Sequence, residues 1–269
     1  MHPGSGLRAA IALVAAMGAG VAAQPGKPPA KPRPTAVKRS PQAVPFAAGE
    51  TLTYEVSWSS FLTAGSATLS VKEKKPSYNS DAYYIVAEGR PTRLLSKLYD
   101  VYYKADTLLD VYSLLPQRGS IYSEEGSRHR IKVTMFDHAR KKAHYEVQAG
   151  TVTKKDLAIA ADSQDALGVL YRLRSIPLKQ GDRFSVSVCD AGQSYKVEIN
   201  VGAVETVKTG IGDLRAWRIT PVPPSSNAAG ARRLTLWVSD DERKLPVRMQ
   251  AQLAVGSFDL TLKSQSAIE

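Results

Sequence analysis

The stretch LTLWVSDDERKLPVRMQ, residues 234–250, contains two runs in which apolar and polar residues alternate. This spacing is typical of half-buried β-strands, whose successive side chains point to opposite faces of a sheet. Six polar residues, 239–244, bridge the two runs, as a short hairpin loop does. The stretch therefore predicts two antiparallel strands, whose apolar faces carry Leu234, Leu236 and Val238, then Leu245, Val247 and Met249.

The loop of this hairpin raises the question of acid–base catalysis, because Asp240, Asp241 and Glu242 follow one another directly. Paired catalytic carboxylates need a pocket that separates their pKa values, and an exposed hairpin tip offers none. Asp at the start of a loop has a simpler role, since its side chain bonds to nearby backbone N–H groups. We interpret the acids as a turn and predict no catalytic residue.

The same two-residue period dominates the chain from residue 50 onward. One helix interrupts it around 163–175, with Asp162 or Ser163 as its cap, and a short helical turn is plausible at 91–99. We predict an all-β, mostly antiparallel barrel or half-barrel of about a dozen strands, whose one short α-helix plugs or covers the opening. The segments with strand periodicity are 51–58, 67–71, 81–89, 100–108, 116–123, 128–136, 142–148, 182–189, 193–201, 203–208, 213–220, 231–239, 245–254 and 256–264.

The N-terminal region predicts export. Arg8 precedes the uncharged, apolar run 9–23, which ends in Val-Ala-Ala, as in a cleavable signal peptide over 1–23. Residues 24–45 hold seven prolines and five basic residues but no acid, which indicates an extended linker. We predict a single β-rich domain over 46–269, a periplasmic location and no transmembrane helix in the mature chain.

Charge and cysteine usage narrow the classes of partner. The net charge is +11, but from Phe46 onward 30 basic residues face 25 acidic ones, so the domain is only mildly basic. Nucleic acid is therefore not an expected partner. Cys189 is the only cysteine, which excludes an intramolecular disulfide, and its strand context favours an inert thiol.

Motifs for familiar chemistry are missing. The sequence holds no H-E-x-x-H, G-x-S-x-G, S-x-x-K or G-x-x-x-x-G-K-[ST] motif. Beyond the signal peptide its histidines are His129, His138 and His144, without the cysteines or closely spaced acids of a metal site. We predict no metal ion and no cofactor.

Two features favour binding of a ligand. Ten of the twelve tyrosines lie between Tyr54 and Tyr145, a density that suits a cavity wall, although β-sheets favour Tyr in any case. In the strand 128–136, a basic face could hold a phosphate headgroup, but such a face is more often solvated and outward. The ligand contacts that we predict are Tyr54, Trp58, Tyr103 and His129.

Several motifs together resemble the bacterial domain-of-unknown-function 3108 family over nearly all of 46–264. The resemblance implies a secreted or periplasmic β-rich protein of Gram-negative bacteria, without an assigned activity and without catalytic residues to transfer. The motifs, in order, are GETLTYEVSW with AGSATLSV (49–71), YYIVAEG with LLSKLYDV (83–101), FDHARKKAHYE (136–146), QDALGVLYRLRSIPLKQGD (164–182) and LWVSDDERKLPVRMQAQL (236–253).

The hairpin 236–253 is also similar to those of half-barrel lipoprotein carriers of the periplasm, which is an analogy of fold alone. It supports our leading hypothesis of a non-enzymatic cell-envelope protein whose curved sheet binds an apolar or lipid-like ligand. One alternative is a structural module that docks envelope components. Another is an enzyme that acts on envelope glycan or lipid. A cavity lined by Tyr and aliphatic residues would favour the first hypothesis, and a filled core with a flat exposed apolar patch would favour the second. Buried, converging acids would favour the third.

Overall fold

The computed structural model describes residues 39–59, 62–97, 101–222, 224, 234–253 and 256–266. The chain divides into two units, Met1–Lys38 and Arg39–Glu269, of which only the second is described. The predicted signal peptide, 1–23, and most of the predicted linker therefore lie outside the described residues. Linker residues that are described already contact the sheet, since the backbone N–H of Gln42 donates to the Val111 carbonyl at 3.0 Å.

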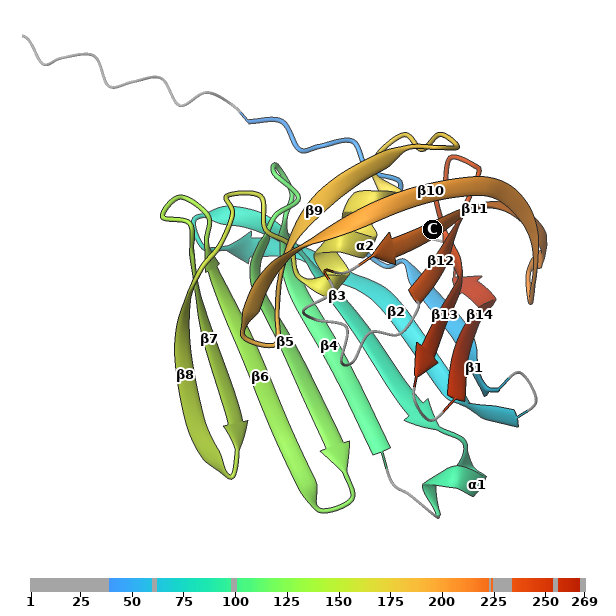
Figure 1. Ribbon diagram of the computed structural model, residues 1–269, viewed down its shortest axis with the longest axis horizontal. Coiled ribbons are helices and arrows are strands. Elements are labelled where there is room, and N and C mark those ends of the chain that lie inside the picture. The colour runs from blue at the N-terminus through green and yellow to red at the C-terminus, as the bar shows by residue number, and fades with distance from the viewer. Residues whose placement is uncertain are drawn as a thin grey trace, which may run out of the picture. The chain divides into compact units, whose positions relative to one another are not determined.

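The described residues form one antiparallel sheet of 14 strands (Figure 1). Its order is β8-β7-β6-β5-β4-β3-β2-β1-β14-β13-β12-β11-β10-β9. Strands consecutive in the chain therefore pair, except β8 and β9, and the pairing of β1 with β14 joins the two halves. The strands are β1 Thr51–Trp58, β2 Leu62–Ser77, β3 Ser80–Pro91, β4 Val101–Asp110, β5 Pro116–Glu125, β6 Arg128–Asp137, β7 Lys142–Ala149, β8 Thr151–Ala158, β9 Arg183–Asp190, β10 Gln193–Thr209, β11 Gly212–Val222, β12 Leu234–Ser239, β13 Pro246–Leu253 and β14 Gly256–Ser266.

The two edge strands, β8 and β9, are linked by the chain that follows β8. Gln164 forms a parallel bridge with Val188, in which the Gln164 N–H donates to the Ser187 carbonyl at 2.8 Å. The Lys155 ammonium also donates to the Gly192 carbonyl at 2.9 Å. The sheet therefore curls until its edges approach, which confirms the predicted all-β, barrel-like fold.

Helix α2, Ala166–Arg174, lies in the hollow of the sheet (Figure 1). Its N-cap is Asp165, whose carboxylate accepts a hydrogen bond from the Gly168 N–H at 2.6 Å. The predicted caps, Asp162 and Ser163, are wrong by two to three residues, because the bridge to β9 keeps the chain extended through Gln164. The short helix α1, Arg93–Ser96, follows β3 and confirms the predicted turn at 91–99.

One end of the half-barrel, which we call the sealed end, is closed by a buried cluster around Arg174. The guanidinium of this α2 residue donates to both carboxylate oxygens of Glu50, at 2.6 and 2.8 Å, and both residues are almost completely buried. It also donates to the Lys244 carbonyl in the β12–β13 loop at 3.0 Å. The rings of Phe46 and Tyr171 pack edge to face beside it, 4.7 Å apart. This cluster ties the helix to β1 and to the β12–β13 loop.

The strand count differs from the sequence-based prediction at two places. Strand β8 was not predicted, because as an edge strand it is exposed along almost its whole length and shows no apolar alternation. Strand β10 is a single strand of 17 residues, although the sequence suggested two. A register shift between Val201 and Val204 produced the apparent break in periodicity.

Candidate ligand cavity

A cavity of about 270 Å³ lies between α2 and the inner faces of seven strands. Because most of the lining side chains are aliphatic, the wall offers few hydrogen-bonding groups. Apolar cavities of this kind stay dry and accept small apolar molecules. The lining residues are Tyr54, Ala67, Thr68, Leu69, Ala87, Glu88, Gly89, Tyr103, Lys104, Ala105, Ile121, Leu167, Leu170, Met249 and Leu260.

The hollow arises from a block of small residues on β2, β3 and β4. Strand pairing places Ala67 beside Gly89 and Ala87 beside Ala105, so four neighbouring inward positions carry almost no side chain. A Cβ atom added to Gly89 would meet no atom within 4 Å. Helix α2 bridges this depression instead of filling it, and the space that remains is the cavity.

The cavity is closed toward the sealed end and open in the other direction. Leu167 and Leu170 of α2 cover it on one side, and Leu69 in its wall is only 3% exposed. Tyr103, at the other side of the wall, is 45% exposed. We call this the open end of the half-barrel; α1 and the β5–β6 turn lie there (Figure 1).

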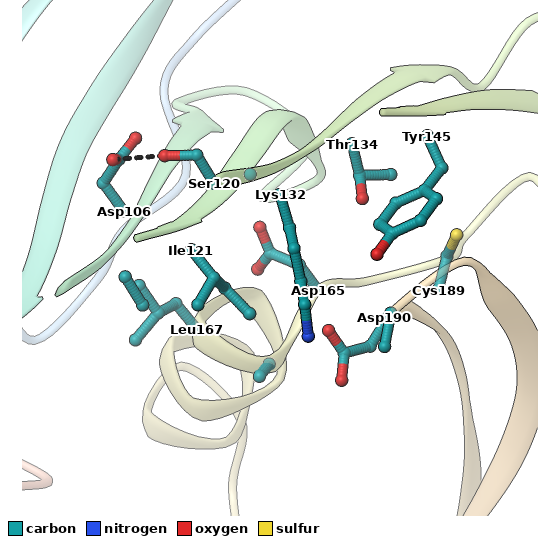
Figure 2. Close-up of a pocket in the computed structure, with 14 residues that line it drawn as sticks. Asp106, Ser120, Ile121, Lys132, Thr134, Tyr145, Asp165, Leu167, Cys189 and Asp190 are labelled. Carbon is teal, nitrogen blue, oxygen red and sulfur yellow. Dashed lines mark hydrogen bonds between the residues drawn. The ribbon is translucent and has the colours of Figure 1, made fainter. Parts of the chain in front are cut away.

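A small polar pocket of about 50 Å³ adjoins the cavity and shares Ala105, Ile121 and Leu167 with it. Figure 2 shows Lys132 from β6 and Tyr145 from β7 facing Asp165 and Asp190 across this pocket. Burial raises the pKa of Asp165 from 3.8 to about 6, although the hydrogen bond from Gly168 opposes the shift. The pocket thus places an ammonium, a phenol and two carboxylates at one side of an apolar space.

Cys189 lies at the edge of the same pocket, where it is 1% exposed. Burial, reinforced by Asp190 and Asp165, raises the pKa of its thiol to about 11. Because the thiolate is the reactive form, this environment agrees with the predicted inert thiol.

Two of the four predicted ligand contacts lie in the cavity wall. Tyr54 and Tyr103 face the cavity from β1 and β4. Trp58, at the last position of β1, is 41% exposed and is not among the lining residues. His129 is farther away, near the start of β6, with its ring 3.7 Å from the Glu124 carboxylate and its side chain 60% exposed.

The basic face of β6 has the opposite orientation to the one expected. Lys132 pairs with Ile121 across the strands and lines the inner pocket, so it points into the half-barrel. Arg128 and Arg130 share this face by strand alternation. His129 lies on the other face, which removes it from the inner surface.

The acidic hairpin loop is a turn, as predicted. Asp241 accepts hydrogen bonds from the Ser239 hydroxyl at 2.6 Å and from the Arg243 backbone N–H at 3.1 Å. Burial alone would raise the pKa of Asp241, but the Ser239 hydroxyl and the Arg243 guanidinium together hold it below its ordinary value. Across the described part of the chain, no cluster of three or more His, Cys, Asp or Glu residues is arranged to hold a metal ion.

A family comparison identifies the chain. The model of the family described as protein of unknown function, DUF3108, matches residues 53–263. The chain belongs to the DUF3108 family. The matched region begins in β1 and ends in β14, so the family covers the whole curved sheet, including every strand that lines the cavity.

One solved structure supports the fold of this DUF3108 chain. A β-barrel-like protein of domain of unknown function DUF1849 from Brucella abortus aligns with a TM-score of 0.55 at 11% identity, covering 82% of this chain and 98% of that one. A protein from Bacteroides fragilis, described as exported with a YmcC-like fold, aligns with a TM-score of 0.34 at 11% identity, covering 85% and 100%. No curated protein matches the sequence. Among the described residues of the DUF3108 chain, no helix has the length and apolarity needed to cross a bilayer.

Sequence reasoning missed the residues that create the cavity. It searched for large aromatic side chains, whereas the space exists because Ala67, Ala87, Gly89 and Ala105 are small. One signal was available, because a glycine inside a strand commonly marks the close approach of a ligand or another backbone. Gly89 in YYIVAEG is such a residue, and its backbone does not require glycine.

Proposed function

We propose that this protein is a non-enzymatic, periplasmic envelope protein that holds an apolar, acyl-chain-like ligand inside its curved sheet. The observation that carries the proposal is the cavity of about 270 Å³ between α2 and the small residues of β2, β3 and β4. Its volume is near the lower limit of roughly 300 Å³ for ligand pockets, which suits a short chain or part of a longer one.

The chemistry of the wall favours an apolar chain over a polar metabolite. Leu167, Leu170 and Met249 contribute only carbon and sulfur atoms to the wall. The Tyr54 hydroxyl is already committed, since it donates to the Pro246 carbonyl at 2.8 Å. A ligand rich in hydroxyl groups would therefore lose its bonds to water without replacing them.

Among the described residues around the cavity, the acid with a clearly raised pKa is Asp165, and its contacts favour holding a ligand over catalysis. Asp165 has the raised pKa that catalytic acids often show. Its carboxylate is nevertheless engaged as the α2 cap, and its Oδ2 would lie 2.5 Å from a Cβ added to Gly119. A group packed so closely against backbone leaves little space for a reacting substrate.

The direct test fills the cavity. Gly89→Phe places a ring in open space without backbone strain, so the fold should persist while the cavity closes. We expect wild type to bind a fluorescent fatty acid and to carry lipid in native mass spectrometry of protein purified from its own envelope. Gly89→Phe should weaken probe binding at least tenfold.

The matched control is Ala158→Phe, which adds the same ring at an exposed position of β8 and should leave binding unchanged. Probe binding that is equal in wild type and Gly89→Phe would contradict the proposal. So would a wild-type protein that takes up no fatty acid or phospholipid.

A further inference from the structure

The open end of the half-barrel exposes large apolar side chains close to the cavity mouth. Leu94, in α1, is 70% exposed, and Leu62, the first residue of β2, is 42% exposed. Strand pairing places Leu62 directly beside Trp58, which is 41% exposed. Three large apolar side chains therefore gather where β1 ends, β2 begins and β3 runs into α1.

Basic side chains lie at the same end of the sheet as these apolar residues. Arg93 and Lys97 flank Leu94 on α1, and both are exposed. Arg128 and Arg130 are exposed at the start of β6, at the same end of the sheet. Within the described part of the chain, none of these four cations forms an ion pair with a carboxylate.

In the described part of the chain, the last two residues of β5, Glu124 and Glu125, are acids that lie at this end and have local partners. Glu124 accepts from the Tyr122 hydroxyl and faces His129 at 3.7 Å, and Glu125 accepts from the Tyr103 hydroxyl. These contacts hold the acids within β4, β5 and β6, whereas Arg93 and Lys97 project with Leu94 on α1.

We propose that the open end docks on the surface of a bilayer that contains anionic phospholipid. Exposed Leu and Trp side chains beside Lys and Arg are the composition of segments that insert into the headgroup region, where basic groups gain from the negative surface potential. We favour a bilayer over a protein partner because exposed cations flank Leu94 and the exposed apolar side chains lie near the cavity that would take an acyl chain.

The docking deepens the proposed function and rests on it in one respect. An acyl chain that enters the cavity leaves a membrane, and the mouth beside Tyr103 opens at the same end as Leu94. Docking at this end would let a chain pass from bilayer to cavity without crossing water.

The test is flotation of the full chain with phosphatidylcholine vesicles, with and without about one third phosphatidylglycerol. We expect binding to the anionic vesicles, at least tenfold weaker for Leu94→Asp and for the double variant Arg93→Glu/Lys97→Glu. The matched control is Tyr78→Asp at the opposite end, where Tyr78 is 55% exposed, and it should bind like wild type. The basic linker is present in every variant, so its contribution cancels.

Insertion is measured separately with an environment-sensitive dye on Leu94→Cys or on Tyr78→Cys. Native Cys189 is buried with a raised thiol pKa, so it should not react with the dye. A blue shift with anionic vesicles is expected only at position 94. Equal flotation of Leu94→Asp and wild type, or equal blue shifts at both positions, would overturn the docking. Vesicle binding that persists in Gly89→Phe, together with lost fatty-acid binding, would show that docking and ligand holding are separate events.

Discussion

The two ends of the half-barrel differ in whether their charged side chains are buried with a partner or exposed to solvent. At the sealed end, Arg174 and Glu50 are buried together, and each nitrogen of the guanidinium donates to the carboxylate or to a loop carbonyl. At the open end, Arg93 and Lys97 are exposed beside Leu94. Basic side chains are therefore buried against protein partners at the sealed end, whereas at the open end they are accessible to solvent.

This difference predicts that residues important for stability and residues important for binding lie at opposite ends of the half-barrel. A buried ion pair whose partners satisfy each other contributes to stability only while both remain, whereas exposed groups contribute little. We therefore expect substitutions at the sealed end to unfold the protein and substitutions at the open end to change what it binds.

The largest effect is expected for Arg174→Met. It leaves the Glu50 carboxylate buried without its partner, and breaking a buried pair in this way costs about 3–5 kcal/mol. Urea denaturation measures the loss. Arg93→Met at the open end is the matched control and should change the free energy of unfolding by less than about 0.5 kcal/mol. Similar losses in the free energy of unfolding in both variants would contradict the difference between the two ends.

The next effect concerns pH and lies at the Asp165 cap of α2. Because burial raises the pKa of this carboxyl from 3.8 to about 6, the folded state keeps a proton that the unfolded state has lost between these values. Stability should therefore fall as pH rises from about 4 to about 6, by roughly 2 kcal/mol after allowance for solvent screening.

Urea midpoints across this range measure the slope, which Asp165→Asn should remove. Asp110 and Asp241 have lowered pKa values, so their contributions are lost only as pH falls below about 4. A slope that persists in Asp165→Asn would assign it to another group.

A smaller effect is expected for Tyr54→Phe. Its hydroxyl donates to the Pro246 carbonyl in a buried position, and removing such a bond costs about 1 kcal/mol. Fatty-acid binding should be unchanged, because the ring that lines the cavity remains. Tenfold weaker binding with unchanged stability would instead show that the hydroxyl contacts the ligand.

The smallest effect is expected for Leu94→Ala at the open end. Since this side chain is 70% exposed, its truncation should change the free energy of unfolding by less than about 0.5 kcal/mol. Vesicle binding should weaken in the same variant. Thermal unfolding with and without vesicles measures both, and a destabilisation above about 1 kcal/mol without vesicles would show that Leu94 packs against the fold.

The sequence predicted the sheet well because strand periodicity is local. Thirteen of the fourteen strands overlap a segment predicted as strand, and only β8, exposed along almost its full length, escaped detection. Alternation assigns residues to two faces but does not say which face becomes concave. For this reason the basic face that carries Lys132 was expected outside and lies inside.

The sealed end was beyond prediction for a different reason. Glu50 and Arg174 are 124 residues apart in the chain, and each alone resembles an ordinary surface charge. Their burial follows from the path of the chain after β8, which bridges to β9 before α2 begins. The cavity depends on the same long-range arrangement, since Ala87 and Gly89 form a hollow only when α2 lies above them.

The most direct test of the central claim is a crystal structure with a brominated fatty acid, in which anomalous scattering locates the chain. We predict a bromine peak inside the cavity, between Leu167 of α2, Ala87 of β3 and Met249 of β13. The peak should be absent in Gly89→Phe crystals. Ordered bromine only on the outer face of the sheet, or an interior that stays empty at saturating ligand, would contradict the account.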